Sequence, residues 1–240
     1  MVLWSLVIGA GAWGAVTASH ELGPLAADWF QIRHVEVVGT DRVTREEVME
    51  HLSLRADDTL LSFDSEAAVD RLKSHAWIKD ANVSRVPFHT VSVRLTERRA
   101  AAVLRGPALN LLLDDEGHVL AIMEDPTRPE LPLLHGIDPA RLIQGNAWAR
   151  RTARDGIRLA GLVGQVFDGP WRVDAGDPLN FVAHVQGRRF HFGPSSFEEK
   201  WALYQMVQPR LGGSADHARG NATSEIDLRY ANKVIVRERG

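Results

Sequence analysis

The stretch QIRHVEVVGTDRVTREEVMEHL, residues 31–52, decides the fold of the first part of the chain. Its polar and apolar side chains alternate as far as the turn Gly39–Asp41, which predicts a short β-strand. Thr44 and Glu47 then have the spacing of a capping box, so a helix with an apolar stripe is expected to begin at this point. The stretch therefore predicts a strand followed directly by a helix.

Three more elements are expected before residue 98. Asp64 is a second N-cap candidate, and the helix after it has apolar residues at helical spacing. Its buried side is expected to consist of Val69, Leu72 and Ala76. Two strands follow at Ala81–Pro87 and Val91–Glu97. Residues 30–98 are thus predicted to form a domain with the element order β-α-α-β-β.

Residues 99–240 are rich in strand-like segments and are expected to form a mixed β-sheet domain with helices. One helix is capped by Asn146, and a second begins at the capping box of Ser196 and Glu199. Strands are expected at Ala101–Leu104, Leu111–Leu113, His118–Ile122, Trp171–Val173, Phe181–Val185 and Arg188–Phe192. The fold class of the whole chain is therefore α+β.

A two-residue turn joins the last two of these strands and fixes which side chains face each other. The expected pairs are Phe181 with Phe192 and Ala183 with Phe190, which gives one apolar face. His184 and His191 fall on the other face, where we interpret them as solvent-facing residues, because no third ligand is spaced to complete a metal site. The acidic turn Asp114–Gly117 lacks the spacing of an EF-hand and is interpreted as a solvated hairpin tip.

The first residues differ from the rest of the chain, because Val2–Ser19 contains no charged side chain. As a helix these residues would span about 27 Å, close to the thickness of the hydrocarbon core of a bilayer. The sequence therefore predicts a transmembrane helix within residues 1–22, or an uncleaved signal anchor. No Lys or Arg precedes the segment, so the distribution of positive charge does not orient it, and a cleaved signal peptide fits less well.

An alternative interpretation of the same residues is a dinucleotide-binding site. Gly9, Gly11 and Gly14 match the spacing G-x-G-x-x-G, which would make the chain an NAD-dependent enzyme. The regular alternation of strands and helices that a doubly wound sheet requires does not follow, which favours the membrane helix. Removing residues 1–22 would destroy the fold of such an enzyme. If the segment is instead a membrane anchor, the domains after it should stay folded without it.

Composition excludes several classes of function. The chain has 240 residues, a formal net charge of -3 and no cysteine, so disulfides, thiolate metal sites and a cysteine nucleophile are excluded. The slightly acidic balance argues against a nucleic-acid partner. No catalytic motif such as a nucleophile elbow, a P-loop or HExxH is present, so no enzyme activity, cofactor, metal or small-molecule substrate is expected.

Residues 30–98 resemble a POTRA domain. The matching segments are Val35–Gly39, Leu60–Asp64, Ala76–Ile78, Val83–Pro87 and Val91–Arg98. The order of parts over nearly the whole chain resembles the bacterial cell-division FtsQ (DivIB) family, which has a membrane helix, a POTRA domain and a β-domain. The matching pieces of the β-domain are Phe192-Gly193, Glu199-Lys200, Asp227–Tyr230, Asn232 and Val234. A third interpretation is a component of an outer-membrane insertion or secretion system. Tandem POTRA repeats and a long C-terminal barrel would favour it, and the sequence pattern shows neither.

The resemblance implies a single-pass protein of the cell inner membrane, with the bulk of the chain extracytoplasmic and located at the division septum. It implies a non-enzymatic scaffold of the divisome that binds FtsB and FtsL through the C-terminal part of the β-domain. The sequence departs from the family in two places. The cytoplasmic tail typical of the family is absent before Met1, and Pro194 stands where many members have a basic residue.

Tyr230 is the partner-binding residue that the family motif indicates. The segment Lys233–Arg237 is our candidate for an exposed edge strand, because such a strand offers unpaired backbone groups to a partner segment. The candidate partner-binding residues are therefore Tyr230, Lys233, Val234, Ile235, Val236 and Arg237.

Overall fold

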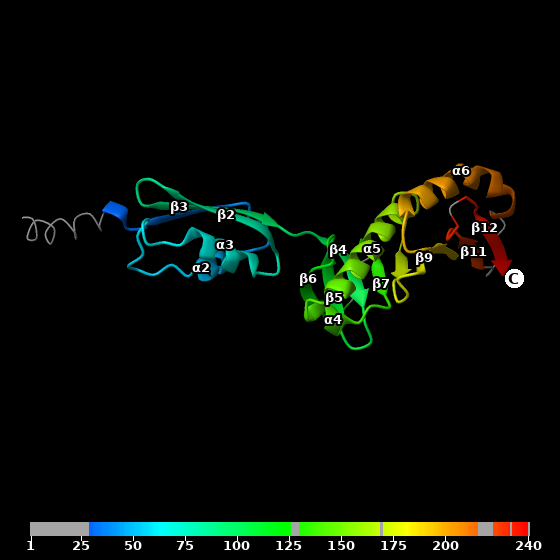
Figure 1. Cartoon of the computed structure of the whole chain (residues 1–240), viewed down its shortest axis with the longest axis horizontal. Coiled ribbons are helices and arrows are strands. Elements are labelled where there is room, and N and C mark those ends of the chain that lie inside the picture. Colours follow the sequence, from blue (N-terminus) through cyan, green and yellow to red (C-terminus); the bar gives the residue numbers. More distant parts are fainter. Residues whose placement is uncertain (1–28, 126–129, 169, 216–222, 231, 240) are drawn as a thin grey trace, which may run out of the picture. The chain divides into compact units, whose positions relative to one another are not determined.

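The computed structural model describes residues 29–125, 130–168, 170–215, 223–230 and 232–239 (Figure 1). The predicted membrane helix and the glycines of the dinucleotide alternative lie outside these ranges. Within the described residues, no helix combines the length and the apolar character that crossing a bilayer requires. The residues fall into two compact units that divide between Arg98 and Arg99.

The first unit has the predicted element order β-α-α-β-β. Its elements are β1 (His34–Val38), α2 (Arg45–Leu52), α3 (Ser65–Lys73), β2 (Ile78–Val86) and β3 (Thr90–Glu97). The strand order in the sheet is β1-β3-β2, with β1 parallel and β2 antiparallel to β3. Figure 1 shows α2 and α3 together beside the hairpin of β2 and β3. The core between the helices and the sheet includes Val48, Leu52, Leu72, Ile78, Val91 and Val93.

Both helices begin where the sequence predicts. Thr44 and Glu47 form the capping box of α2, and the Asp64 carboxylate accepts two backbone N–H groups at the start of α3. The prediction that Ala76 lies on the buried side of the second helix is wrong. The helix ends at Lys73, and Ala76 is exposed in the connection to β2.

A carboxylate ties the end of the sheet to the start of α2. The Glu97 carboxylate accepts the backbone N–H groups of Asp41, Arg42 and Val43, at distances between 2.8 and 3.1 Å. Gly39 allows the turn to pass close to the backbone of β3. Its φ is +92°, and a Cβ at this position would lie 2.1 Å from the carbonyl oxygen of Leu95. The turn after β1 is therefore fixed by glycine and by one acidic side chain.

The second unit contains one nine-stranded sheet with helices. Its strands are β4 (Ala100–Arg105), β5 (Asn110–Asp114), β6 (Val119–Met123), β7 (Leu133–His135), β8 (Trp171–Asp174), β9 (Phe181–Val185), β10 (Arg188–Phe192), β11 (Thr223–Asp227) and β12 (Ile235–Arg239). Its helices are α4 (Pro139–Ile143), α5 (Ala147–Gly164) and α6 (Phe197–Ala215). The strand order is β12-β11-β10-β9-β8-β7-β4-β5-β6. The sheet is mixed, as predicted, because three of its pairs are parallel: β4 with β7, β7 with β8, and β10 with β11.

The helices α5 and α6 contribute to one core on one face of this sheet. The predicted register of the hairpin is confirmed, with Phe181 opposite Phe192 and Ala183 opposite Phe190. These side chains meet aromatic residues of α6, and the edge-to-face contacts centre on Phe190 and Trp201. The aromatic side of α6 is Phe197, Trp201 and Tyr204, and all three are buried.

One predicted cap is wrong. Asn146 caps α5 through its side-chain oxygen, as expected. Ser196 instead has φ +59°, in the left-handed region, whereas a capping serine normally has an extended backbone. The start of α6 is held by the Lys200 backbone N–H, which donates to the Ser196 carbonyl.

Candidate partner-binding edge of the C-terminal sheet

The strand β12 is one edge of the nine-stranded sheet. It pairs antiparallel with β11, from Asp227 opposite Ile235 to Thr223 opposite Arg239. Among the residues that the structure describes, no strand lies on its other side. Backbone N–H and C=O groups on that side are therefore available to an additional strand from a partner.

The predicted edge segment Lys233–Arg237 overlaps this strand and begins two residues before it. Val234 packs against the core, so it anchors the approach to the strand and does not belong to the edge itself. Lys233 also precedes β12, and its ammonium lies 5.1 Å from the centre of the Tyr230 ring. The residues of the prediction that lie on the strand are Ile235, Val236 and Arg237.

The two faces of β12 differ in character. Val236 is opposite the buried Ile226, on the face that bears the helices. Ile235 and Arg237 are opposite Asp227 and Glu225, on the other face of the sheet. A strand that added to this edge would therefore meet the exposed Val236 on one face and Ile235 and Arg237 on the other.

The loop between β11 and β12 is fixed by its own side chains. The Arg229 side chain donates two hydrogen bonds to the Asp227 carboxylate, and the buried Leu228 donates its N–H to the His191 carbonyl at 2.8 Å. The hydrogen bond from Arg229 holds the pKa of Asp227 below its ordinary value. Tyr230 follows this fixed turn and is 48% exposed, so its ring is presented to solvent next to the edge strand.

Sequence reasoning did not foresee how Gly193 and Lys200 support this loop. Lys200 of α6 is buried, its ammonium donates to the Ser195 carbonyl at 2.7 Å, and burial lowers its pKa. A Cβ on Gly193 would lie 3.1 Å from this ammonium and 3.8 Å from the Arg229 carbonyl oxygen. The end of β10, helix α6 and the loop after β11 therefore pack closely together at Gly193, Lys200 and Arg229. Pro194 is exposed beside them.

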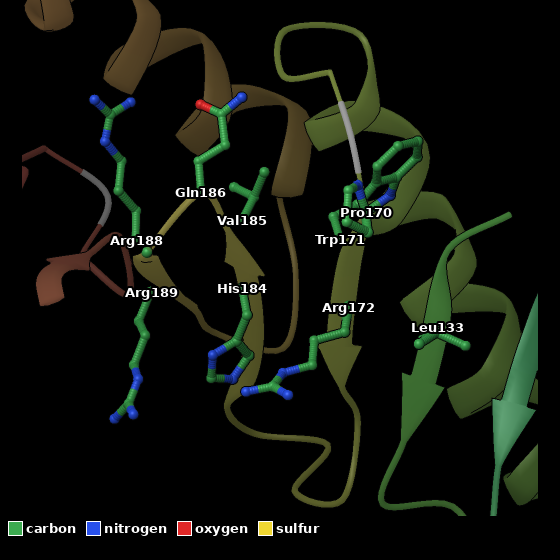
Figure 2. Close-up of a pocket in the computed structure, with 10 residues that line it drawn as sticks. Leu133, Pro170, Trp171, Arg172, His184, Val185, Gln186, Arg188 and Arg189 are labelled. Carbon is green, nitrogen blue, oxygen red and sulfur yellow. The ribbon is translucent and has the colours of Figure 1, made fainter. Parts of the chain in front are cut away.

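A cationic pocket lies on strands β8, β9 and β10, away from the edge strand β12 (Figure 2). It has a volume of about 370 Å³, and Arg172, His184 and Arg189 line it from the neighbouring strands β8, β9 and β10. Figure 2 shows the imidazole of His184 between the two arginine side chains. Burial and the two arginines lower the pKa of His184 to about 4, so this side chain is neutral at pH 7.

The two histidines that were considered as metal ligands have separate environments. His184 is opposite Arg189, and His191 is opposite Val182. The Nε2 atom of His191 lies 3.1 Å from the Glu225 carboxylate. Both histidines are half-buried, so the expectation that they simply face solvent is wrong.

The acidic hairpin turn is also less solvated than expected. Asp114 is fully buried, and its carboxylate accepts the backbone N–H groups of Glu116 and His118. Ligand atoms of Asp114, Glu116 and His118 lie within 4.8 Å of one another. The Asp114 carboxylate closes the hairpin, which accounts for its burial without a metal ion.

Comparison with known proteins assigns the first unit. The family model described as "POTRA domain, FtsQ-type" matches residues 30–98. The chain is 26% identical over 218 residues to "Cell division protein FtsQ" of Geobacter sp. (strain M21), which covers 87% of this chain and 76% of that protein. It is 25% identical over 231 residues to the protein of the same name from Anaeromyxobacter sp. (strain K), covering 91% of this chain and 75% of that protein. A shorter match to the FtsQ protein of Zymomonas mobilis reaches 32% identity over 127 residues, 53% of this chain and 40% of that protein.

The fold of the first unit and this match define a protein that carries a POTRA domain of the FtsQ type. Over most of its length the chain is similar to bacterial FtsQ cell division proteins, and its first unit matches the FtsQ-type POTRA model, in agreement with the FtsQ/DivIB family that the sequence pattern predicted. The alternative of an NAD-dependent enzyme has no support in these matches. Neither described sheet has the parallel, doubly wound strand order that the alternative requires.

Proposed function

We propose that this protein is a non-enzymatic, single-pass scaffold of the divisome that binds other division proteins outside the cytoplasmic membrane. In this proposal residues 1–22 form the membrane helix, residues 30–98 the POTRA domain and residues 99–240 the partner-binding β-domain. The names and coverage of the FtsQ relatives support the role in division. The uncharged stretch Val2–Ser19 supports the membrane helix.

The partner that we propose for the β-domain is the FtsB subunit of the FtsB–FtsL pair. The observation that carries this proposal is the outer side of β12, which no strand of the described residues covers, beside an exposed tyrosine. A segment of the partner would add to the sheet as a further strand, and its backbone groups would pair with those of β12. Tyr230 would act as an aromatic anchor, because a tyrosine ring contributes a large contact area at low cost in side-chain entropy.

The charges next to the edge indicate the chemistry of the partner segment. Lys233 and Arg237 are exposed, and both are positively charged. An acidic side chain on the added strand would pair with them, and an apolar side chain would cover Val236. The same two cations oppose indiscriminate pairing of edges between copies of this chain.

A proline scan of β12 tests strand addition. In an antiparallel pair, neighbouring residues direct their N–H groups to opposite sides, so one of Val236 and Arg237 donates to β11 and the other points away from the sheet. Val236→Pro and Arg237→Pro are each compared with the unchanged chain in thermal unfolding and in co-purification with FtsB. The substitution that leaves the unfolding temperature nearly unchanged should still abolish binding, because it removes only a donor that a partner would use.

The other edge of the same sheet gives the matched control. Ile122 lies on the edge strand β6 and is exposed, so Ile122→Pro should leave FtsB binding intact. Deleting Lys233–Gly240 should abolish binding. Strand addition at β12 is refuted if both prolines in β12 leave co-purification unchanged, or if Ile122→Pro abolishes it while the chain stays folded.

The tether is tested separately. A reporter that is active only outside the cytoplasm is fused after Gly240, and the cells are fractionated. An active reporter in the membrane fraction is expected. A cytoplasmic reporter signal, or one that is wholly released from membranes, would contradict the single-pass topology.

A further inference from the structure

One end of the POTRA unit exposes large apolar side chains. Trp29 is 75% exposed, Phe30 41%, Leu61 69% and Phe88 86%. Scattered exposed apolar residues are ordinary, but a group of four with three aromatic rings marks an interaction surface. We call these four residues the apolar tip.

Backbone hydrogen bonds hold the three segments of the apolar tip together. The Leu60 N–H donates to the Phe30 carbonyl at 2.7 Å, which joins the loop after α2 to the start of the described chain. The Arg33 N–H donates to the His89 carbonyl at 2.8 Å, and the His89 ring contacts the Gln31 carbonyl at 2.8 Å. These contacts place the turn between β2 and β3 beside the same residues, and Figure 1 shows this turn at the end where the described chain begins.

The turn that carries Phe88 holds two non-glycine residues in the left-handed region of the backbone map. Phe88 has φ +70° and His89 has φ +72°, both in the left-handed region. Glycine or asparagine adopts this backbone at much lower cost than a bulky aromatic residue. Strain of this kind is found mainly where a side chain serves an interaction, so Phe88 is better explained by a contact than by the stability of the turn.

The position of the apolar tip in the chain indicates what it contacts. The described chain begins at Trp29, and only the nine residues His20–Asp28 separate it from the uncharged stretch Val2–Ser19. Nine residues span at most about 30 Å, so a membrane that holds this stretch lies within reach of the apolar tip.

The composition of this end of the unit agrees with a lipid surface. Aromatic and long aliphatic side chains with nearby basic residues are typical of segments that lie in the headgroup region of a bilayer. Arg33, Arg55 and Arg85 are exposed on the three segments that carry the apolar tip. Asp57 and Asp58 lie in the same loop as Arg55, and the Asp58 carboxylate accepts the Arg55 backbone N–H.

We propose that the apolar tip inserts into the headgroup region of the membrane and holds the POTRA unit against the bilayer. This inference rests on the proposed tether, because the tether brings the unit to the membrane. The contact would fix the POTRA domain at the lipid surface by its N-terminal end and leave its opposite end, at the turn after β1, in water.

Fluorescent labels on single cysteines test the proposal in the full chain reconstituted in vesicles of phosphatidylethanolamine and phosphatidylglycerol. The natural chain has no cysteine, so each label reports on one site. Leu61→Cys places an environment-sensitive dye in the apolar tip. Thr40→Cys places it in the turn after β1, about 16 Å away along the length of that strand. Emission is measured with lipids that carry a nitroxide quencher and, separately, with iodide in the water.

The expected result is a blue shift and quenching by the lipid nitroxide at position 61, with protection from iodide. The label at position 40 should be quenched by iodide and not by the lipid. Phe88→Asn in the Leu61→Cys chain should reduce lipid quenching and increase iodide quenching, while thermal unfolding shows that the domain remains folded. Vesicles of phosphatidylcholine alone separate insertion of apolar side chains from attraction to anionic headgroups.

The outcomes separate this inference from the proposed function. Equal iodide quenching at positions 61 and 40 would overturn the membrane contact of the apolar tip, whatever the state of the tether. Extraction with alkaline carbonate tests the tether in the same vesicles. If the chain resists extraction but iodide quenches its label at position 61, the tether is supported and the membrane contact of the apolar tip is refuted. A chain that is extracted although its label is quenched by lipid contradicts the tether alone.

Discussion

Arg229 holds the Asp227 carboxylate with hydrogen bonds of 2.9 and 2.6 Å from its side chain, and its own backbone N–H donates a further bond of 3.0 Å. Asp227 is the last residue of β11, so this pair sets the direction in which the chain leaves the sheet. Tyr230 and Lys233 lie within the four residues that follow Arg229 in the chain. The geometry of the candidate binding edge therefore depends on an ion pair that need not touch the partner itself.

Asp227→Asn should weaken both the fold and the presentation of the edge. Losing the charge-assisted hydrogen bonds of a buried carboxylate typically costs about 1–3 kcal/mol of unfolding free energy. The folded-state pKa of Asp227 is depressed, so its contribution is present above a pH of about 4 and is lost as the pH falls through the lower folded-state pKa. Chemical denaturation of both chains from pH 7 to pH 3 should show the difference in stability shrinking below pH 4. A constant difference would contradict the assignment.

Glu97→Gln should destabilise the POTRA unit by about 1–3 kcal/mol, because a neutral amide accepts the three backbone N–H groups less strongly than a carboxylate. Burial raises the pKa of Glu97, but the hydrogen bonds from Asp41, Arg42 and Val43 outweigh it and the pKa is lowered overall. Amide hydrogen exchange at residues 41–43 measures the effect locally. Glu36→Gln, on the exposed side of β1, is the matched control and should leave exchange unchanged.

His184 should titrate near pH 4, far below an ordinary histidine. Because its folded-state pKa is depressed, the neutral form is favoured in the fold, and stability is lost as the pH falls from about 6.5 toward 4. The titration is followed by NMR of the imidazole protons in the unchanged chain and in Arg189→Ala. Removing this neighbouring cation should move the midpoint upward. A midpoint near 6.5 in the unchanged chain would show that the pocket is more open to water than the structure indicates.

Phe88→Gly should raise the stability of the POTRA unit by about 1 kcal/mol, because glycine relieves the left-handed strain at φ +70° without loss of a buried contact. Thermal unfolding measures this directly. A lower unfolding temperature in the variant would mean that the Phe88 ring contributes to the fold, which would remove the strain argument for its role in the apolar tip.

The sequence predicted the elements whose local signals agree with their packing. Capping residues located α2, α3 and α5, and the two-residue turn Gln186-Gly187 fixed the register of β9 and β10. These local signals could not predict the strand order of the nine-stranded sheet. It depends on parallel pairs such as β10 with β11, whose partners are separated by the whole of α6.

The alternation of residues predicted where the candidate edge lies, but it did not predict where the strand begins and ends. Alternation in Lys233–Arg237 indicated a strand, but it did not reveal that Val234 would be taken up by the core. The remaining misses are local details of the backbone and of one turn. Ala76 lies beyond the end of its helix, Ser196 adopts a left-handed backbone, and the Asp114 carboxylate turns inward to close its own hairpin.

The parallel pairing of β1 with β3 also dictates the order of events when the chain is made. The hydrogen bond from the Asp41 N–H to the Glu97 carboxylate joins residues 56 positions apart. Until residue 97 has been synthesised, β1 has no partner strand and the apolar sides of α2 and α3 lack the sheet that covers them. At roughly 5–20 residues per second this interval lasts about 3–11 seconds. The first unit therefore completes its core only when its last strand arrives.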